Sequence, residues 1–199
     1  HRPDPETPVE ETMGALSDLV KKGKALYVGI SNYSDEEAKK AIAVLKENKT
    51  PCLIHQPRYN MFERWVEDGL LDTLEQEGVG CIAYSPLAQG ALTDKYLKGI
   101  PEGSRASRTG STVAGRYLTE ERLDQIKKLN AIAENRGQSL AQMALSWILS
   151  HKALTSVLVG ASSAGQLENS IAAVGKLSFE QAELDQIEAI IGKGPGLLA

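Results

Sequence analysis

The chain contains 199 residues with a mass of 21.5 kDa, a length that suits one domain or a large part of one. Hydrophobic residues make up 42% and charged residues 24%, as in ordinary globular proteins, so the composition argues against a disordered chain. The net charge of -4 excludes no enzyme class but argues against a nucleic-acid partner. No apolar run approaches the roughly 18 residues of a membrane-spanning helix, which argues against a membrane partner.

The first expected helix covers the segment TPVEETMGALSDLVKKGK. Thr7 suits the N-cap, Pro8 suits the first helical position, and Gly23 closes the helix. The apolar residues on its inward stripe are Val9, Met13, Leu16 and Val20. The spacing therefore predicts an amphipathic helix of ordinary length.

A short apolar run, ALYVGIS, follows and predicts a buried strand that ends at the polar pair Ser31 and Asn32. In the next expected helix, SDEEAKKAIAVLKEN, Ser34 and Glu37 have the spacing of a capping box. The apolar residues expected to face inward there are Ala38, Ile42 and Leu45.

The same alternation of strand and helix continues along the chain. The expected strands are CLIHQ, CIAYS and TSVLVGAS, and the expected helices are LLDTLEQEG, EERLDQIKKLNAIAENRG, SLAQMALSWILSH, QLENSIAAVGK and SFEQAELDQIEAIIG. A long irregular stretch is expected from Pro86 to about Thr119. Strands that alternate with helices predict a parallel sheet, and strands that are almost continuously apolar predict that both faces of the sheet are covered.

The residues at the ends of these strands help to distinguish between an open sheet and a closed barrel. No Gly-rich phosphate fingerprint follows the first strand, as an open nucleotide-binding sheet would usually show. The four strands end instead in Ser31–Asn32, His55–Gln56, Tyr84–Ser85 and Gly160–Ser162. In a TIM-type barrel the carboxyl ends of the strands build the active-site face. We therefore predict an α/β fold of the TIM-type (β/α)8 barrel class, of which this chain covers roughly the C-terminal half.

Three features could bind a ligand, and each has an ordinary structural alternative. The turn from Gly160 to Ser162 opens a helix and suits a phosphate, but such turns are common in α/β proteins. Tyr84 in YSPLAQGAL offers a ring for stacking, or simply packs in the core. The stretch from Pro86 to Thr119 is either a lid over a phosphate-bearing ligand or a solvated loop. Its cationic residues are Lys95, Lys98, Arg105, Arg108 and Arg116.

The cysteines and histidines predict no further chemistry. Cys52 and Cys81 lie in apolar stretches, where a buried, reduced thiol is usual, so we expect no disulfide and a cytoplasmic location. His55 ends a strand, and His151 follows a helix whose dipole it could favour. Because no HxxxH or CxxC spacing is present, no metal site is expected.

Five segments, taken in order, resemble the aldo-keto reductase superfamily: YVGISNYS, LIHQPRYN, AYSPLAQGALTDKY, GQSLAQMALSWIL and SVLVGASSAGQLE. The resemblance runs along nearly the whole chain and is strongest to the bacterial branch that reduces glyceraldehyde 3-phosphate, with similarity to the potassium-channel β-subunit branch. It implies an oxidoreductase that uses NADP(H) to reduce small aldehydes or ketones, glyceraldehyde 3-phosphate or methylglyoxal among them. The alternative is a non-catalytic nucleotide-binding half-barrel, or a cofactor sensor like the channel subunits.

The resemblance also implies which residues bind the cofactor. They are Ser31, Asn32, Gln56 and Tyr84 at the nicotinamide, Ser85, Leu87, Gln89 and Lys95 at the pyrophosphate, Arg105, Ser162 and Gln166 at the adenosine 2′-phosphate end, Gly160 in the preceding turn, and Ser170 at the adenine. An arginine offers bidentate contacts to a 2′-phosphate, so Arg105 favours NADPH over NADH. Asn169 and Ser170 stand where the family commonly has a Glu-Asn pair, which leaves the adenine contacts open.

The family reduces carbonyls with a Tyr acid that is supported by Lys, Asp and His. Of these four groups only the histidine matches this chain, as His1 before the Pro-rich turn. We therefore expect residues 1–199 to be the C-terminal part of a single NADP-dependent oxidoreductase barrel domain and to be inactive alone. The substrate and the oligomeric state, a homo-oligomer included, stay open.

Overall fold

Four short parallel strands form the centre of this computed structural model, which describes residues 1–104, 106–108 and 110–192. The strands are β1 (Val28–Ile30), β2 (Cys52–His55), β3 (Gly80–Ala83) and β4 (Leu154–Val157). They follow one another across the sheet in the order β1-β2-β3-β4, and each neighbouring pair is parallel. The predicted parallel sheet is confirmed, and all its carboxyl ends lie at one edge.

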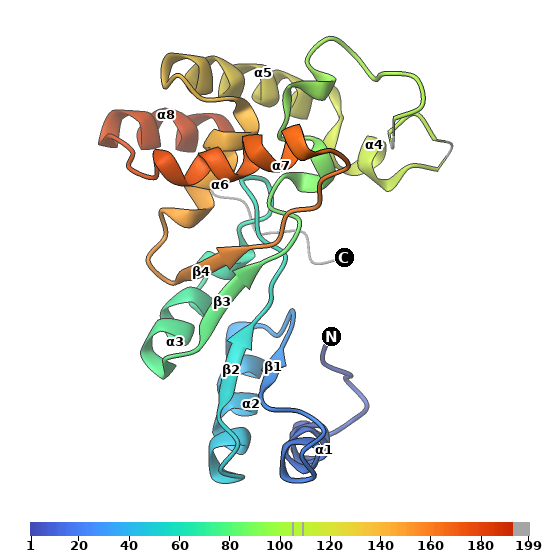
Figure 1. The fold of residues 1–199 in the computed structure, drawn as a ribbon, viewed down its shortest axis with the longest axis vertical. Coiled ribbons are helices and arrows are strands. Elements are labelled where there is room, and N and C mark those ends of the chain that lie inside the picture. Colours follow the sequence, from blue (N-terminus) through green and yellow to red (C-terminus); the bar gives the residue numbers. More distant parts are fainter. Residues whose placement is uncertain (105, 109, 193–199) are drawn as a thin grey trace.

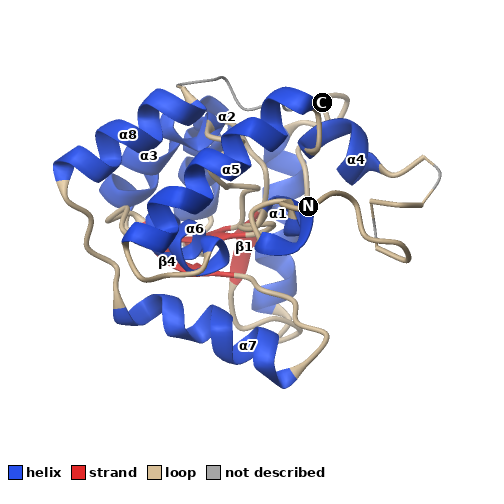
Figure 2. Cartoon of the chain, turned by 90° about the horizontal axis from the view of Figure 1, so that it is seen from above, coloured by secondary structure: helices blue, strands red, loops and turns tan. Residues whose placement is uncertain are grey.

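Eight helices accompany the strands in the described part of the chain. They are α1 (Val9–Lys21), α2 (Asp35–Glu47), α3 (Leu70–Glu77), α4 (Thr112–Tyr117), α5 (Glu120–Asn135), α6 (Leu140–Leu149), α7 (Ala164–Ile171) and α8 (Gln181–Ile191). Figure 1 shows α1 to α3 beside the strands at one end and α5 to α8 gathered at the other. Seen from above, α6 lies between α5 and α7 (Figure 2), and α8 packs on α5. None of the described helices combines the length and the apolar character needed to cross a membrane.

The start of α1 differs from the prediction. Pro8, not Thr7, is the N-cap, and the helix begins at Val9. The Thr7 hydroxyl is already used, because it donates a 2.7 Å hydrogen bond to the Asp4 carboxylate, which also accepts the Glu6 N–H. A side chain engaged in this turn cannot also accept from the first turn of the helix.

The predicted capping box of α2 is confirmed. The Ser34 hydroxyl accepts the Glu37 N–H, and the Glu37 carboxylate accepts the Ser34 N–H at 2.8 Å. The helix then buries Ala38, Ile42 and Leu45 in the hydrophobic core, as its spacing predicts. The capping pattern and the apolar stripe therefore fix both where α2 starts and which side of it faces the sheet.

The prediction that both sheet faces are covered is wrong for part of the sheet. Gly29, Thr155 and Ser156 are exposed, and the Leu53 side chain is 46% exposed. Gly29 also sits where a Cβ atom would lie 2.6 Å from Ile54 Cγ1, so neighbouring strands approach closely there. Apolar strands exposed in this way indicate a sheet that closes against further structure.

The stretch from Pro86 to Thr119 is less irregular than predicted. It contains two short 3-10 turns, η2 (Ala88–Gly90) and η3 (Asp94–Tyr96), as well as α4. Tyr96 and Tyr117 are almost completely buried. The alternative of a solvated loop therefore does not hold for these parts of the stretch, because buried aromatic rings anchor them to the core.

Helix α8 is fastened by two buried arginines. Arg136 is 1% exposed in its side chain, pairs with Glu183 of α8, and donates to Ser178 O at 2.9 Å. Arg64 makes two hydrogen bonds to the Glu188 carboxylate, at 2.6 and 2.9 Å. A buried cation of this kind stabilises the fold only while its partners remain.

We expect Arg136→Ala to lower the free energy of unfolding by about 3 kcal/mol, because the substitution empties a buried site and leaves the buried Gln138 Oε1 without the Arg136 donor. Lys128→Ala is the control, since Lys128 and Asp124 form an ion pair in which both side chains are 60% exposed. That substitution is expected to cost about 0.5 kcal/mol or less. Urea denaturation measures both, and equal losses would contradict this account of α8.

Candidate functional site

A cleft of about 1170 Å³ lies at the carboxyl ends of β3 and β4. Its walls come from the segment after β3, the start of α6 and the turn from β4 into α7. The predicted residues that line it are Ser85, Leu87, Gln89, Lys95, Gly160, Ser162, Gln166 and Ser170. Small-molecule sites typically measure about 300–1,000 Å³, so this cleft has room for an extended ligand.

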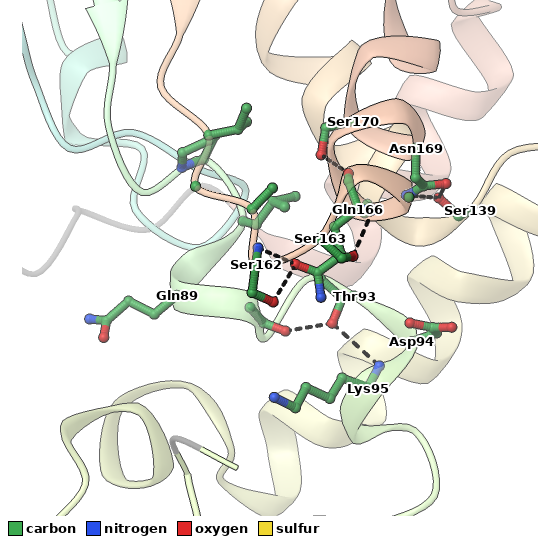
Figure 3. A pocket seen from close by; sticks show the side chains of 18 of the residues that line it. Gln89, Thr93, Asp94, Lys95, Ser139, Ser162, Ser163, Gln166, Asn169 and Ser170 are labelled. Carbon is green, nitrogen blue, oxygen red and sulfur yellow. Dashed lines mark hydrogen bonds between the residues drawn. The ribbon is translucent and has the colours of Figure 1, made fainter.

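The turn into α7 presents hydroxyl and amide groups to the cleft. Ser163 caps the helix by accepting the Gln166 N–H, while the N–H and the hydroxyl of Ser162 both donate to Gln166 Oε1, at 2.9 and 3.0 Å. Figure 3 shows these side chains together, with Thr93 and the long side chain of Lys95 nearby. A helix N-terminus with hydroxyl donors and a cation beside it suits an anion such as a phosphate.

The far end of the cleft is held by an amide network between α6 and α7. Asn169 Nδ2 donates to the Ser139 hydroxyl at 3.2 Å, and Gln142 Nε2 donates to Asn169 Oδ1 at 3.0 Å. Ser139 and Gln142 are also the capping box of α6. Ser139 was not predicted as a site residue, although the spacing of Ser139 and Gln142 is that of a capping box. Only the packing of α7 along α6 brings Ser139 to the cleft.

Unusual backbone conformations gather at this edge of the sheet. Among the described non-glycine residues five have positive φ, and four of them are Asn32, Ser85, Ala88 and Gln89, with φ between 47° and 57°. The fifth, Lys49, lies in the α2–β2 connection. Such backbone strain is commonly found at functional sites.

A second cluster surrounds the side chain of Asn32, which is 6% exposed. Asn32 Oδ1 accepts from the Tyr84 hydroxyl at 3.1 Å and from the Arg58 N–H at 3.2 Å. Asn32 Nδ2 donates to the Ser31 hydroxyl at 2.9 Å. One amide therefore joins the carboxyl ends of β1, β2 and β3, and we call this group the Asn32 cluster.

Gln56 and His1 reach the Asn32 cluster through their backbone. The Ser31 hydroxyl donates to Gln56 O at 2.7 Å, and His1 O lies 3.5 Å from Asn32 Nδ2. The His1 side chain is exposed. The structure therefore brings the residues predicted at the nicotinamide together, one strand end away from the cleft that holds the other predicted residues.

Comparison with known proteins identifies the family. The sequence profile of the Aldo/keto reductase family matches residues 1–192. The chain belongs to the aldo/keto reductase family. It is similar to L-glyceraldehyde 3-phosphate reductase of Escherichia coli O157:H7, with 56% identity over 198 residues, 98% of this chain and 57% of that protein. It is 39% identical to a Schizosaccharomyces pombe protein named as a voltage-gated potassium channel subunit beta, across 87% of this chain and 52% of the relative.

The solved structure of a thermostable aldo-keto reductase in complex with epalrestat gives the fold. It matches with a TM-score of 0.69 and 24% identity, over 96% of this chain and 57% of that one. The predicted fold class is thereby confirmed: the chain has the fold of part of an aldo-keto reductase TIM barrel. It spans little more than half the length of these relatives.

Arg105 is the one predicted aldo-keto reductase site residue that the structure does not address, because it lies outside the described residues. Three connected residues at the end of β3 were missed: Arg58 lies over the Tyr84 ring, Asn60 donates to Ser85 O, and Glu63 contacts both. The segment QPRYNMFER places charged residues directly after the apolar strand β2, which could have indicated a site there. Their partners could not be predicted, because Glu63 pairs with Arg116, far along the chain.

The two cysteines, His55 and His151 do not line this cleft. Both cysteines are free and buried, and burial raises the pKa of the Cys81 thiol to about 12. Burial lowers the pKa of His55 to about 4, and its Nε2 lies 3.1 Å from Tyr33 O. Burial also lowers the pKa of His151, which packs on the Trp147 ring with centroids 5.0 Å apart. That His151 favours the dipole of α6 stays a prediction.

Gln89→Gly is expected to raise the stability of the chain by up to about 1 kcal/mol, because glycine adopts positive φ without the steric cost that other residues bear. Lys49→Gly is the matched control, with φ 58° against 57° for Gln89. Urea denaturation should give gains of similar size for both variants. A loss of stability for either one contradicts the assignment of backbone strain.

Proposed function

We propose that the full-length protein is an NADPH-dependent aldo-keto reductase that reduces small aldehydes or ketones to alcohols. The single observation that carries this proposal is the edge of the sheet from the Asn32 cluster to the cleft at α7, where the exposed side of the Tyr84 ring and a helix N-terminus suited to an anion lie along one line of strand ends. Bound NADPH supplies the hydride. The chain's own residues bind and orient it.

At the nicotinamide end, Tyr84 offers its half-buried ring and Asn32 its amide. Asn32 Oδ1 already accepts two hydrogen bonds, whereas the contact from Nδ2 to His1 O is long at 3.5 Å. One amide hydrogen is therefore available for a carboxamide oxygen. Ser31 and Gln56 complete the proposed carboxamide site.

At the phosphate end, the donor set fits a pyrophosphate and a 2′-phosphate. Lys95 supplies the cation and the residues after β3 supply backbone groups. At the start of α7, Gln166, whose Oε1 accepts from Ser162, supplies the neutral donor of its side-chain amide. The proposed preference for NADPH over NADH rests on Arg105, from its side-chain chemistry alone. The proposed residues of this end are Ser85, Leu87, Gln89, Lys95, Arg105, Gly160, Ser162, Gln166 and Ser170.

We also propose that residues 1–199 are the C-terminal part of a single barrel domain. β1 and β4 are the two edge strands of the sheet, and parallel strands with free edges need partners. Apolar side chains are exposed on α7 and the turn that follows it, with Ile171 at 58% and Val174 at 61%. Further strands of a full-length protein would cover these edges and bring the family's Asp, Tyr and Lys beside His1.

The proposed substrate is a small carbonyl compound such as glyceraldehyde 3-phosphate or methylglyoxal. The 56% identity to an L-glyceraldehyde 3-phosphate reductase supports the phosphorylated aldehyde. The 39% identity to a protein named as a potassium channel subunit supports a second candidate function, a nucleotide-binding sensor without turnover. The oligomeric state, a homo-oligomer included, and a cytoplasmic location remain parts of the proposal.

A turnover assay distinguishes the reductase from the nucleotide-binding sensor. The full-length protein is expected to oxidise NADPH when glyceraldehyde 3-phosphate or methylglyoxal is added, with the loss of NADPH absorbance as the measurement. Tight NADPH binding without oxidation by either aldehyde would contradict the reductase and favour the sensor.

Lys95→Met should raise the Kd of the full-length protein for NADPH about tenfold, because one charge-assisted hydrogen bond to phosphate is lost. Lys98→Met is the matched control: both lysines are exposed in the same segment, but Lys98 does not line the cleft. Isothermal titration calorimetry measures both values. An equal loss in the two variants would mean that only general charge attraction is involved.

A further inference from the structure

A buried carboxylate is linked through Arg58 and Asn60 to the end of β3, where the Tyr84 ring forms what we call the Tyr84 platform, the proposed stacking surface for the nicotinamide. Glu63, in the connection between β2 and α3, is 3% exposed. Its Oε2 accepts from the Tyr117 hydroxyl at 2.5 Å and from Asn60 Nδ2 at 2.9 Å, and its Oε1 lies 2.5 Å from Arg116 and 3.5 Å from Arg58. A buried carboxylate is costly unless it is paired, so these four partners are what hold it there. We call these five residues the Glu63 network.

One side of the Glu63 network contacts the end of β3. Asn60 Nδ2 also donates to Ser85 O at 3.1 Å. The Arg58 guanidinium carbon lies 5.5 Å from the centre of the Tyr84 ring, and the Arg58 N–H donates to Asn32. The network therefore braces Tyr84 through its ring and through the backbone of the residue that follows it.

The other side of the network belongs to α4. Arg116 and Tyr117 are the last two residues of this helix, at the end of the stretch that carries Lys95 and Gln89. α4 packs against η2, the turn that contains Gln89. Figure 1 shows α4 at one side of the chain. Burial, together with the Glu63 carboxylate, raises the pKa of Tyr117, so its phenol stays protonated and donates.

We infer that the Glu63 network couples α4 to the Tyr84 platform, so that Arg58, Glu63 and Tyr117 are positioning residues for the nicotinamide half of the cofactor. This inference rests on the proposed function. None of these three side chains lines the cleft at the phosphate end. Their removal should therefore weaken the nicotinamide contacts and leave the contacts to the adenosine phosphates unchanged.

The test compares NADPH with adenosine 2′,5′-bisphosphate, a fragment of NADPH that lacks the nicotinamide. Tyr117→Phe and Arg58→Met in the full-length protein are expected to raise the Kd for NADPH about fivefold, a coupling of ordinary size, and to leave the Kd for the fragment unchanged. Tyr117→Phe keeps the buried ring and removes only the hydroxyl that bonds Glu63. Arg58→Lys, which keeps the charge, should restore part of the NADPH affinity.

Arg122→Met is the control. The Arg122 guanidinium carbon lies 4.6 Å from the centre of the Phe62 ring in the same region, but its side chain donates a hydrogen bond to Gln125, outside the network. Circular dichroism confirms that each variant is folded. Equal losses for both ligands, no loss for either, or the same NADPH loss in Arg122→Met would overturn the inference while leaving the proposed function intact. If the unmodified protein binds neither ligand, the proposed function fails and the inference fails with it.

Discussion

The side-chain amide of Asn32 is the interaction on which the geometry of the site depends. Parallel strands bring their carboxyl ends to one edge, but they do not by themselves fix the side chains there. Asn32 does so by accepting from Tyr84 and from the Arg58 backbone while donating to Ser31. Its positive φ of 56° turns the amide toward the neighbouring strands, a conformation that asparagine tolerates better than most residues.

The remainder of the site follows from strand pairing. Tyr84 and Gly160 are far apart in the sequence, yet they lie at one edge because β3 pairs with β4, with Cys81 opposite Leu154. The cleft opens where the chain leaves β3 for η2 and where it leaves β4 for α7. This arrangement lets one extended ligand contact a rigid strand end and a helix N-terminus at once, which is how TIM-type barrels typically build their binding sites.

The sequence predicted what depends on local pattern. The capping box of Ser34 and Glu37, the apolar stripe of α2 and the polar strand ends each have a local signature, and all were found. Long-range contacts have no such signature. From the sequence alone Glu63 would be predicted to lie on the surface, but the structure buries it against Tyr117. Leu53 would be predicted to be buried, but one side of the sheet is not covered there and the side chain is exposed. Thr7 failed as a cap because a neighbouring carboxylate competes for its hydroxyl.

A crystal structure of the full-length protein with NADPH tests the central claim most directly. We predict that the nicotinamide stacks on Tyr84 with its carboxamide at Asn32, and that the phosphates lie between Lys95 and the start of α7. The same structure would show whether further strands pair with β1 and β4. A nucleotide bound away from this edge of the sheet, or a Tyr84 ring left uncovered beside it, would contradict the account.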